Sequence, residues 1–279
     1  MKKILITGSS GFIGKNLIDH FNGYFNLILT TRKKRKGLYF LDLRDAINKD
    51  TLPNKIDVII HLAQSRLYSK NNLKDIFDVN VRAIDKLLNF AKQIKVKQFI
   101  NLSSGSIYNP YNGKMLETDL INPDTYYEYS KYISELLVNE YSNIFTTCNL
   151  RVFFPYGRYQ NKGFLVRIIK KIYKENYFNL TDDKNIIFSP IFVDDLTKII
   201  ENVVNKKWQG TFNISSPYKY SIVDVYKIVS DNLKKKIKIE ESTKSPIRII
   251  PNINKLKNKL PNFKFLKLEE TINHILNND

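Results

Sequence analysis

Three glycines near the start of the chain constrain its fold more than any other feature. Gly8, Gly11 and Gly14 follow an apolar run at residues 3–7 and open a helical pattern at residues 11–21. A glycine turn between a strand and a helix is typical of the first strand–helix–strand unit of a parallel sheet. The N-terminal part of the chain is therefore expected to have an α/β fold.

The same glycines predict a ligand. The first permits the tight turn, the second lets the backbone approach a pyrophosphate, and the third lets the helix pack closely on the strand. The helix N-terminus adds N–H groups and a positive dipole end, which attract phosphate. We expect a dinucleotide, NAD(H) or NADP(H), on this turn.

The alternation of strands and helices continues through the first two-thirds of the chain. Strand-like runs follow at residues 26–31, 37–41, 58–63, 99–103 and 147–153, and helical patterns at residues 73–94 and 127–142. This alternation predicts a Rossmann-type, doubly wound parallel sheet with helices on both faces.

Beyond residue 156 the pattern loosens. Helices are expected at residues 164–173, 194–204, 221–233 and 268–276, and extended segments at residues 186–192, 211–214 and 236–240. We predict a dinucleotide-binding Rossmann domain of residues 1–155 plus 187–214. A smaller, discontinuous α+β lobe of residues 156–186 plus 215–279 is expected to bind the substrate.

The end of the second strand discriminates between the two dinucleotides. An NAD enzyme normally places an acid there for the ribose 2′-hydroxyl, whereas this strand ends in Thr31 and Arg32. Because the planar guanidinium suits a 2′-phosphate, we favour NADP(H), with NAD(H) as the alternative. The competing interpretation is that the cations of residues 32–35 form an exposed basic loop.

Further motifs recur in order along the chain. They are Asp42-Leu43, His61-Leu62-Ala63, Asn80, the Ser104-Gly-Ser106-Ile-Tyr108 segment, Tyr127-x-x-x-Lys131, Leu150-Arg151, Tyr156-Gly157 and Phe192-Val-Asp-Asp-Leu196. With the glycine turn, their order and spacing resemble the extended short-chain dehydrogenase/reductase family, in the branch that acts on nucleotide sugars. The resemblance covers essentially the whole chain.

The resemblance implies the cofactor contacts. The Asp42-Leu43 pair would lie at the adenine, the motif after the fourth strand would line the cofactor, and Lys131 would hold the nicotinamide ribose. The implied set is Gly8, Ser10, Gly11, Phe12, Ile13, Gly14, Thr31, Arg32, Asp42, Leu43, Leu62, Ala63, Gln64, Asn80, Tyr127 and Lys131.

The resemblance also implies a catalytic set of Ser104, Tyr127 and Lys131. Tyr127 and Lys131 are four residues apart on an expected helix, so they share one face. An ammonium group beside a phenol favours the phenolate, which suits general acid–base catalysis. Ser104 would hydrogen-bond the substrate oxygen. The competing interpretation, that Tyr127 is one tyrosine of a tyrosine-rich stretch, does not account for its offset from Lys131.

Departures from the family pattern narrow the reaction. Sugar-nucleotide 4,6-dehydratases carry an Asp-Glu pair where this chain has Gly105 and Ser106, so dehydration is not expected. Enzymes resembling GDP-fucose synthase use a cysteine and a histidine where this chain has Ser106 and Tyr159. That difference argues against 3,5-epimerisation.

Two reactions need only the Ser/Tyr/Lys set and a nicotinamide. We favour reduction of a nucleoside-diphosphate 4-keto-6-deoxy sugar at C4, in deoxysugar biosynthesis for surface polysaccharide. Two departures from 4-epimerases favour this reduction. No acidic residue follows the second strand, and Phe154 stands where 4-epimerases usually carry Asn. An NAD-dependent nucleotide-sugar 4-epimerase is the alternative. A non-catalytic NADP-sensing relative is the second alternative, although such proteins commonly lack Tyr-x-x-x-Lys.

The nucleoside-diphosphate sugar also needs contacts in the second lobe. Ser104, Ser106 and Tyr127 are expected at the sugar itself. Arg248 is the main candidate for the diphosphate, and Lys162 and Arg167 are secondary candidates. The competing interpretation is that all three are surface cations.

Composition limits the remaining partners. A net charge of +18 suits phosphates, but no nucleic-acid-binding motif accompanies the basic clusters at residues 32–36, 234–238 and 255–267, so we expect no specific nucleic acid. A single cysteine, Cys148, excludes an internal disulfide and fits a cytoplasmic protein. With only three histidines, no metal site is expected. No apolar run reaches the ~20 residues of a membrane span, and the resemblance implies a homodimer.

Overall fold

The computed structural model describes residues 1–32, 35–45, 47, 52–53, 55–65, 73–109, 111, 113–174, 177–179, 185–234, 238–240 and 245–276. By its internal contacts the chain separates into two compact units. The first contains Met1–Asn109, Leu120–Arg151 and Thr197–Phe212, and the second contains Pro110–Asp119, Val152–Leu196 and Asn213–Asp279. Which unit binds the dinucleotide and which the sugar stays a prediction.

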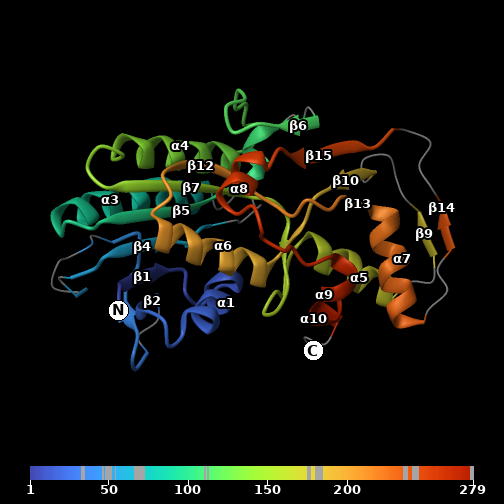
Figure 1. Ribbon diagram of the computed structural model, residues 1–279, viewed down its shortest axis with the longest axis horizontal. Coiled ribbons are helices and arrows are strands. Elements are labelled where there is room, and N and C mark those ends of the chain that lie inside the picture. Colours follow the sequence, from blue (N-terminus) through green and yellow to red (C-terminus); the bar gives the residue numbers. More distant parts are fainter. Residues whose placement is uncertain are drawn as a thin grey trace. The chain divides into compact units, whose positions relative to one another are not determined.

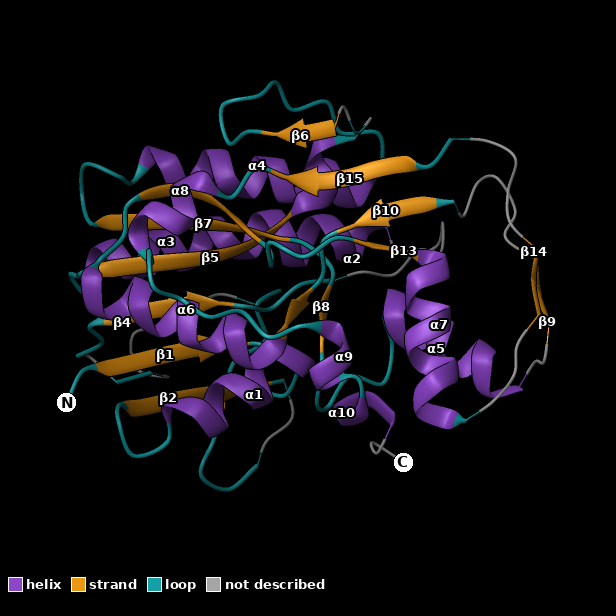
Figure 2. Ribbon diagram, turned by 45° about the vertical axis from the view of Figure 1, so that its right-hand side comes forward, coloured by secondary structure: helices purple, strands orange, loops and turns teal. Residues whose placement is uncertain are grey.

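A seven-stranded sheet forms the frame of the first unit. Its order is β12-β7-β5-β4-β1-β2-β3, and the pairs β1–β2, β1–β4, β2–β3 and β4–β5 are parallel (Figure 2). The strands are β1 (Lys3–Thr7), β2 (Asn26–Thr31), β3 (Tyr39–Phe40), β4 (Val58–His61), β5 (Gln98–Ser104), β7 (Thr146–Val152) and β12 (Gly210–Ile214). The predicted doubly wound α/β fold is confirmed.

The strand order reverses between β1 and β4. Right-handed crossovers that leave this point in opposite directions place their helices on opposite faces of the sheet. The helices are α1 (Phe12–Phe21), α2 (Leu73–Phe77), α3 (Ala83–Gln93), α4 (Tyr126–Glu140) and α6 (Val193–Lys206). Figure 1 shows α3 beside α4 and α1 beside α6, where His20 of α1 contacts Glu201 of α6 at 2.8 Å. The carboxyl ends of β1 and β4 are where such a fold binds its ligand.

Apolar side chains fill the space between the sheet and α3. Leu5 and Ile59 of the strands and Ile84, Leu87 and Leu88 of the helix are fully buried in one cluster. These helical positions recur every three to four residues, which is the spacing of one helix face. The expected helix at residues 73–94 therefore forms, but not as one α-helix. A π-helical turn, Asp78–Arg82, separates α2 from α3.

The second unit contains a four-stranded sheet of order β13-β10-β15-β6 and two two-stranded sheets, β11–β8 and β14–β9. The strands are β6 (Gly113–Met115), β8 (Pro155–Tyr156), β9 (Tyr177–Asn179), β10 (Ile186–Phe188), β11 (Ile191–Phe192), β13 (Tyr220–Ser221), β14 (Lys238–Glu240) and β15 (Ile247–Pro251). The helices are α5 (Phe164–Lys174), α7 (Ile222–Leu233), α8 (Asn254–Lys259), α9 (Leu268–Thr271) and α10 (Asn273–Leu276).

Two expectations for the second unit need correction. The single helix expected at residues 268–276 is two short helices, α9 and α10. The sequence pattern also did not predict β15, which pairs with β10 on one side and β6 on the other. Both pairings are long-range, so local periodicity carries no sign of them. Residues 236 and 237 of the expected strand at 236–240 lie outside the described residues.

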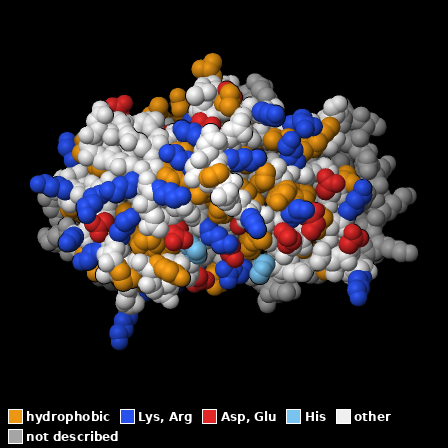
Figure 3. Space-filling model, in the orientation of Figure 1, with side chains coloured by type: hydrophobic (Ala, Val, Ile, Leu, Met, Phe, Trp, Pro, Cys, Tyr) orange, Lys and Arg blue, Asp and Glu red, His pale blue; other side chains and the backbone are white. Residues whose placement is uncertain are grey.

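Basic side chains are widely distributed on the surface. Figure 3 shows lysine and arginine side chains spread among acidic, apolar and other groups on the face that it presents. Residues 33, 34 and 235–237, which belong to two of the basic clusters in the sequence, lie outside the described residues. None of the described helices combines the length and apolar character that a bilayer crossing requires.

Candidate functional site

The glycine turn joins β1 to α1 at the point where the strand order reverses. Gly8 has a left-handed φ of +71°, and the N–H of Gly11 donates to its carbonyl at 3.0 Å. A Cβ on Gly8 would lie 2.7 Å from the backbone N of Ala63 at the end of β4, so no other residue fits there. A Cβ on Gly14 would lie 2.4 Å from the Gly8 carbonyl oxygen. Both glycines are therefore required by packing.

Gly11 differs from the other two. Its φ is −78°, and an added Cβ would meet one atom within 4 Å, the Gly8 carbonyl oxygen at 3.2 Å. It is exposed and serves as the N-cap of α1, with no side-chain hydrogen bond to the helix end. Because α1 has neither a capping side chain nor an acid in its first turn, its N-terminal amides suit an anion such as a pyrophosphate. The neighbouring Ser10 is exposed, and Phe12 and Ile13 are half-buried.

The end of β2 carries the residues expected to select the cofactor. Thr31 is buried and Arg32 is exposed. The Ser9 hydroxyl donates to the Thr30 carbonyl at 2.7 Å, which ties the glycine turn to this strand end. An arginine at this position can reach solvent beside the turn, as an interaction with a ribose 2′-phosphate requires.

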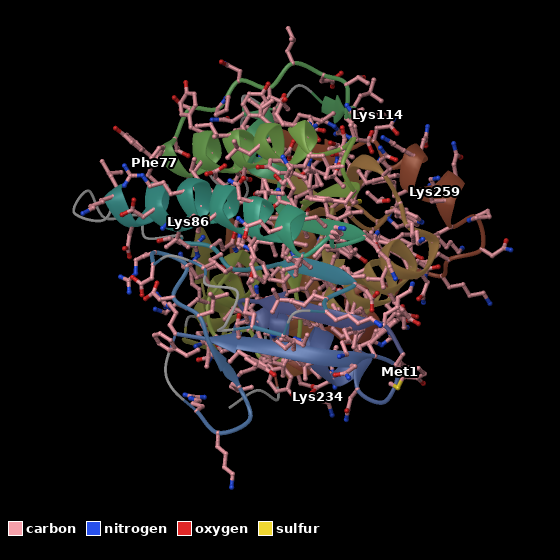
Figure 4. All side chains as sticks on the ribbon, turned by 90° about the vertical axis from the view of Figure 1, so that its left-hand side faces the viewer. Met1, Phe77, Lys86, Lys114, Lys234 and Lys259 are labelled. Carbon is pink, nitrogen blue, oxygen red and sulfur yellow. The ribbon has the colours of Figure 1, made fainter. Side chains whose placement is uncertain are left out.

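The Asp42-Leu43 pair lies in the loop after β3. The Asp42 carboxylate accepts hydrogen bonds from Arg44 at 2.6 and 3.0 Å, and these bonds hold the pKa of Asp42 below its usual value. Leu43 is buried in the cluster under α3. Lys86 of α3, labelled in Figure 4, donates to the Arg44 carbonyl at 2.7 Å and to the Asp45 carbonyl at 3.1 Å. The loop is thus fastened to the helix.

His61 at the end of β4 is a structural residue. Its Nδ1 lies 2.8 Å from the Thr7 hydroxyl of β1. Burial, with the nearby Lys131 ammonium as a second cause, lowers the pKa of His61 to about 3. The imidazole is therefore neutral at physiological pH and holds two strand ends together. Leu62 is buried, and Ala63 and Gln64 are half-buried beside it.

The three expected catalytic residues lie on β5 and α4. Ser104 ends β5, and its Oγ lies 2.9 Å from Ser106 Oγ and accepts from the Ser106 N–H at 3.2 Å. Those bonds begin the 3₁₀ turn Gly105–Tyr108. Lys131 is buried on α4, and its Nζ donates to the Leu102 carbonyl of β5 at 2.5 Å. This contact fixes the helix against the strand two residues before Ser104.

Tyr127 lies in the first turn of α4 and is half-buried. A capping box between Thr125 and Glu128 begins the helix, which fixes the direction of this first turn. The Tyr127 hydroxyl donates to Gln64 Oε1 at 2.9 Å. Gln64 was expected only as a cofactor contact, and no sequence signal indicates that it meets Tyr127. The neighbouring Tyr126 and Tyr129 are exposed.

Asn80 holds the segment after β4 against α4. Its Oδ1 accepts from the Ser65 N–H at 2.8 Å, and its Nδ2 donates to the Ser65 carbonyl at 3.1 Å and to Ser130 Oγ at 2.9 Å. It belongs to the π-helical turn, where one extra residue per turn changes the direction of the side chain. These contacts are structural, and the cofactor contact expected of Asn80 stays a prediction.

The expected diphosphate contacts belong to the second unit. Lys162 precedes α5, Arg167 is on α5 and Arg248 is on β15, and all three side chains are exposed. Their role stays a prediction. Within the described part of the chain, no group of three or more His, Cys, Asp or Glu side chains is arranged to hold a metal ion. Cys148 is buried.

Substitutions at Gly14 and Gly11 should separate an effect on stability from an effect on dinucleotide binding. Gly14→Ala should lower the free energy of unfolding by about 2 kcal/mol, because its Cβ meets backbone that cannot move independently. Gly11→Ala should change stability by less than about 0.5 kcal/mol, yet weaken dinucleotide binding, because its Cβ would take space at the uncapped start of α1, where we expect the pyrophosphate. Urea unfolding and fluorescence titration with NADH and NADPH measure the two effects. Equal stability of the two variants would contradict this assignment.

The buried His61 predicts a pH dependence of stability. The unfolded chain binds a proton at His61 below about pH 6.5, and the folded protein does so only near pH 3. Stability should therefore fall as the pH drops through this window, by up to about 1.4 kcal/mol per unit. Urea unfolding between pH 7 and pH 5 should show a smaller pH dependence in His61→Asn than in the wild type. Equal slopes would contradict the assignment.

Comparisons with known proteins agree with this geometry. The model of the NAD dependent epimerase/dehydratase family matches residues 4–215. GDP-6-deoxy-D-talose 4-dehydrogenase of Aggregatibacter actinomycetemcomitans is 27% identical over 254 residues, which cover 86% of this chain and 83% of that protein. Protein CapI of Staphylococcus aureus is 24% identical over 292 residues, which cover 92% and 83%.

Solved structures share the fold. UDP-glucuronic acid 4-epimerase of Bacillus cereus, in complex with UDP-glucuronic acid and NAD, superposes with a TM-score of 0.86 at 22% identity and covers 99% of this chain and 98% of its own. UDP-glucose 4-epimerase of Thermus thermophilus, in complex with NAD, superposes with a TM-score of 0.79 at 21% identity and covers 99% of each chain. The family match extends over most of the chain and contains the glycine turn and the Ser/Tyr/Lys set, so the chain belongs to the NAD dependent epimerase/dehydratase family.

Proposed function

We propose that this chain is an NADP(H)-dependent reductase of a nucleoside-diphosphate 4-keto-6-deoxy sugar. The observation that carries the proposal is the placement of Tyr127 and Lys131 on α4 and Ser104 on β5, with Lys131 bonded to the Leu102 carbonyl of that strand. A tyrosine can donate the proton that a carbonyl reduction requires, and a serine can hydrogen-bond the carbonyl oxygen. The relative that acts on GDP-6-deoxy-D-talose supports a 6-deoxy sugar nucleotide.

The residues of the first unit fit a dinucleotide. The exposed Gly11 and the uncapped N-terminus of α1 suit the pyrophosphate, and Arg32 suits a 2′-phosphate. A nicotinamide dinucleotide, when bound, supplies the hydride.

Tyr127 would give its phenolic proton to the forming alkoxide at C4, and Ser104 would hydrogen-bond the same oxygen. Lys131 is one helical turn after Tyr127, on the same face of α4, so its positive charge would lie on the side of the helix where the phenolate remains. The Tyr127 hydroxyl donates to Gln64 Oε1, and it would have to exchange this acceptor for the substrate oxygen when the sugar binds.

A nucleotide-sugar 4-epimerase is the second candidate. Solved relatives from Bacillus cereus and Thermus thermophilus are 4-epimerases with NAD bound. The same three residues would serve that reaction, with Tyr127 removing a proton and later returning it. β2 ends in Thr31 and Arg32, without an acidic residue. This favours the NADP(H)-dependent reductase, because an NAD enzyme normally has an acid there. A non-catalytic NADP-sensing protein would have no need of the Tyr127 and Lys131 pair.

NADPH and NADH oxidation against a panel of nucleoside-diphosphate 4-keto-6-deoxy sugars tests the proposal. Oxidation of NADPH in amounts equal to the sugar reduced would support it. Interconversion of 4-epimers without net cofactor oxidation would establish the second candidate instead. If neither reaction occurs although the dinucleotide binds, the non-catalytic reading stands.

Removal of the phenolic hydroxyl tests the catalytic assignment. Tyr127→Phe should lower kcat by about 10²- to 10⁴-fold, the usual value of a general acid. It should change the Kd of the dinucleotide far less, by under about 10-fold, because Phe keeps the aromatic ring. The matched control is Tyr129→Phe, because Tyr129 is an exposed tyrosine on the same helix, and it should keep wild-type activity. Steady-state kinetics and fluorescence titration give both quantities. Equal activity of the two variants would contradict the role of Tyr127.

The cofactor preference has its own test. Arg32→Ala should raise the Kd of NADPH about 10-fold or more, because the guanidinium pairs with the 2′-phosphate, and leave the Kd of NADH unchanged. Lys36→Ala, at a nearby exposed cation, should change neither constant. If Arg32→Ala weakens neither dinucleotide, Arg32 is an ordinary loop cation.

A further inference from the structure

A buried arginine connects the two segments that carry the proposed catalytic residues. Arg151, on β7, is 5% exposed. Its Nε lies 3.1 Å from each carboxylate oxygen of Glu135, and its Nη2 donates to Oε2 at 2.8 Å. Its Nη1 donates to the Tyr108 hydroxyl at 2.5 Å, and its guanidinium lies 4.8 Å from the centre of the Tyr108 ring.

Each partner of Arg151 follows a proposed catalytic residue by four positions in the sequence. Glu135 follows Lys131 by four residues on α4 and Tyr127 by eight, so the three side chains follow one another along one face of the helix. Tyr108 follows Ser104 by four residues and ends the 3₁₀ turn that Ser104 begins. One guanidinium therefore contacts both the helix of Tyr127 and Lys131 and the turn of Ser104.

The chemistry of this contact favours a fixed geometry. Burial alone disfavours the charged guanidinium, but the hydrogen bonds and charge of Glu135 outweigh it and raise the pKa of Arg151. The planar guanidinium matches the carboxylate at two oxygens, which defines its orientation as well as its distance. Such a buried pair is weak evidence for stability, so its position beside the site calls for another explanation.

A second set of buried polar contacts holds the same helix. Asn149 precedes Arg151 by two residues, so it faces the same side of β7. Its Nδ2 donates to Asn139 Oδ1 of α4 at 3.0 Å, and its Oδ1 accepts from Asn101 Nδ2 of β5 at 2.8 Å. The Asn149 contacts thus fix α4 to β7 and β5. Arg151 differs from Asn149 because it also contacts the 3₁₀ turn, through Tyr108.

We propose that Arg151, Glu135 and Tyr108 form a positioning triad that sets the distance between Ser104 and the Tyr127–Lys131 pair. The inference rests on the proposed function, because it assigns these residues a role in that reaction through Ser104. None of the three is taken to touch the substrate. Their effect is on where the Ser104 hydroxyl lies when the carbonyl oxygen is bound.

Tyr108→Phe is the mildest test of the triad. It removes one hydroxyl and keeps the ring under the guanidinium. The rate of hydride transfer in a single turnover, from NADPH to a nucleoside-diphosphate 4-keto-6-deoxy sugar, should fall about 10-fold, since small misplacements of a catalytic group are costly. The KM of the sugar and the Kd of NADPH should stay near wild-type values. The thermal midpoint should fall by only a few degrees, because one buried guanidinium N–H loses this acceptor.

The matched control is Tyr141→Phe. The Tyr141 hydroxyl also donates a hydrogen bond, to Asn89 Oδ1 at 3.0 Å, and lies in the same unit. Its removal should leave the hydride-transfer rate unchanged. A fall equal to that of Tyr108→Phe would mean that any lost hydroxyl slows the reaction, and the triad would have no special role.

A double-mutant cycle with Ser104→Ala separates positioning from general damage. If Tyr108 acts through Ser104, Tyr108→Phe should cause no further loss in the Ser104→Ala background. Multiplicative losses would overturn the proposal. Arg151→Lys keeps the charge but not the fork, and should show the same non-additivity with a larger single effect. If Arg151→Lys does not fold, the Tyr108→Phe cycle alone decides the question.

Different results would contradict the triad and the proposed function. If Tyr127→Phe abolishes hydride transfer and Tyr108→Phe leaves it unchanged, the triad is wrong and the proposed function stands. If the wild-type protein transfers no hydride to any sugar of the panel, or Tyr127→Phe retains full activity, the proposed function is wrong and the triad falls with it.

Discussion

The close approach of three backbone segments at the glycine turn is the constraint on which the rest of the first unit depends. Gly8 leaves no room for a Cβ against Ala63, and Gly14 leaves none against the Gly8 carbonyl. These contacts draw the ends of β1 and β4 and the start of α1 together at the point where the strand order reverses. The neutral His61, bonded to Thr7, holds the same two strand ends. This packing leaves the N-terminus of α1 without a side-chain cap, which suits the pyrophosphate of the proposed dinucleotide.

The proposed reaction depends on how α4 is held against the sheet. Lys131 bonds to the β5 backbone, Asn80 ties the segment after β4 to Ser130, and Arg151 joins Glu135 to Tyr108. Each contact pairs a polar group that would be costly to bury alone. The helix therefore has one defined position, and a defined position is what a proton donor needs relative to the group that it protonates.

The sheet of the first unit and part of the candidate site could be predicted from the sequence, because they depend on short-range patterns. The glycine turn, the seven strands of the large sheet and the offset of Tyr127 from Lys131 are patterns within a few residues of one another. The bond of Tyr127 to Gln64, the Arg151 contacts and strand β15 join residues that are far apart along the chain. The π-helical turn at Asn80 was not predictable either, because its apolar spacing fits an α-helix equally well.

Transfer of deuterium from NADPH to the sugar is the most direct test of the proposed hydride transfer to C4. NADPH that carries deuterium at the transferable position of the nicotinamide C4 would be incubated with the protein and a nucleoside-diphosphate 4-keto-6-deoxy sugar, and the product examined by proton NMR. The account predicts one deuterium at C4 of the sugar for each NADPH oxidised. Product without deuterium at C4, or NADPH oxidation without a reduced sugar, would contradict it.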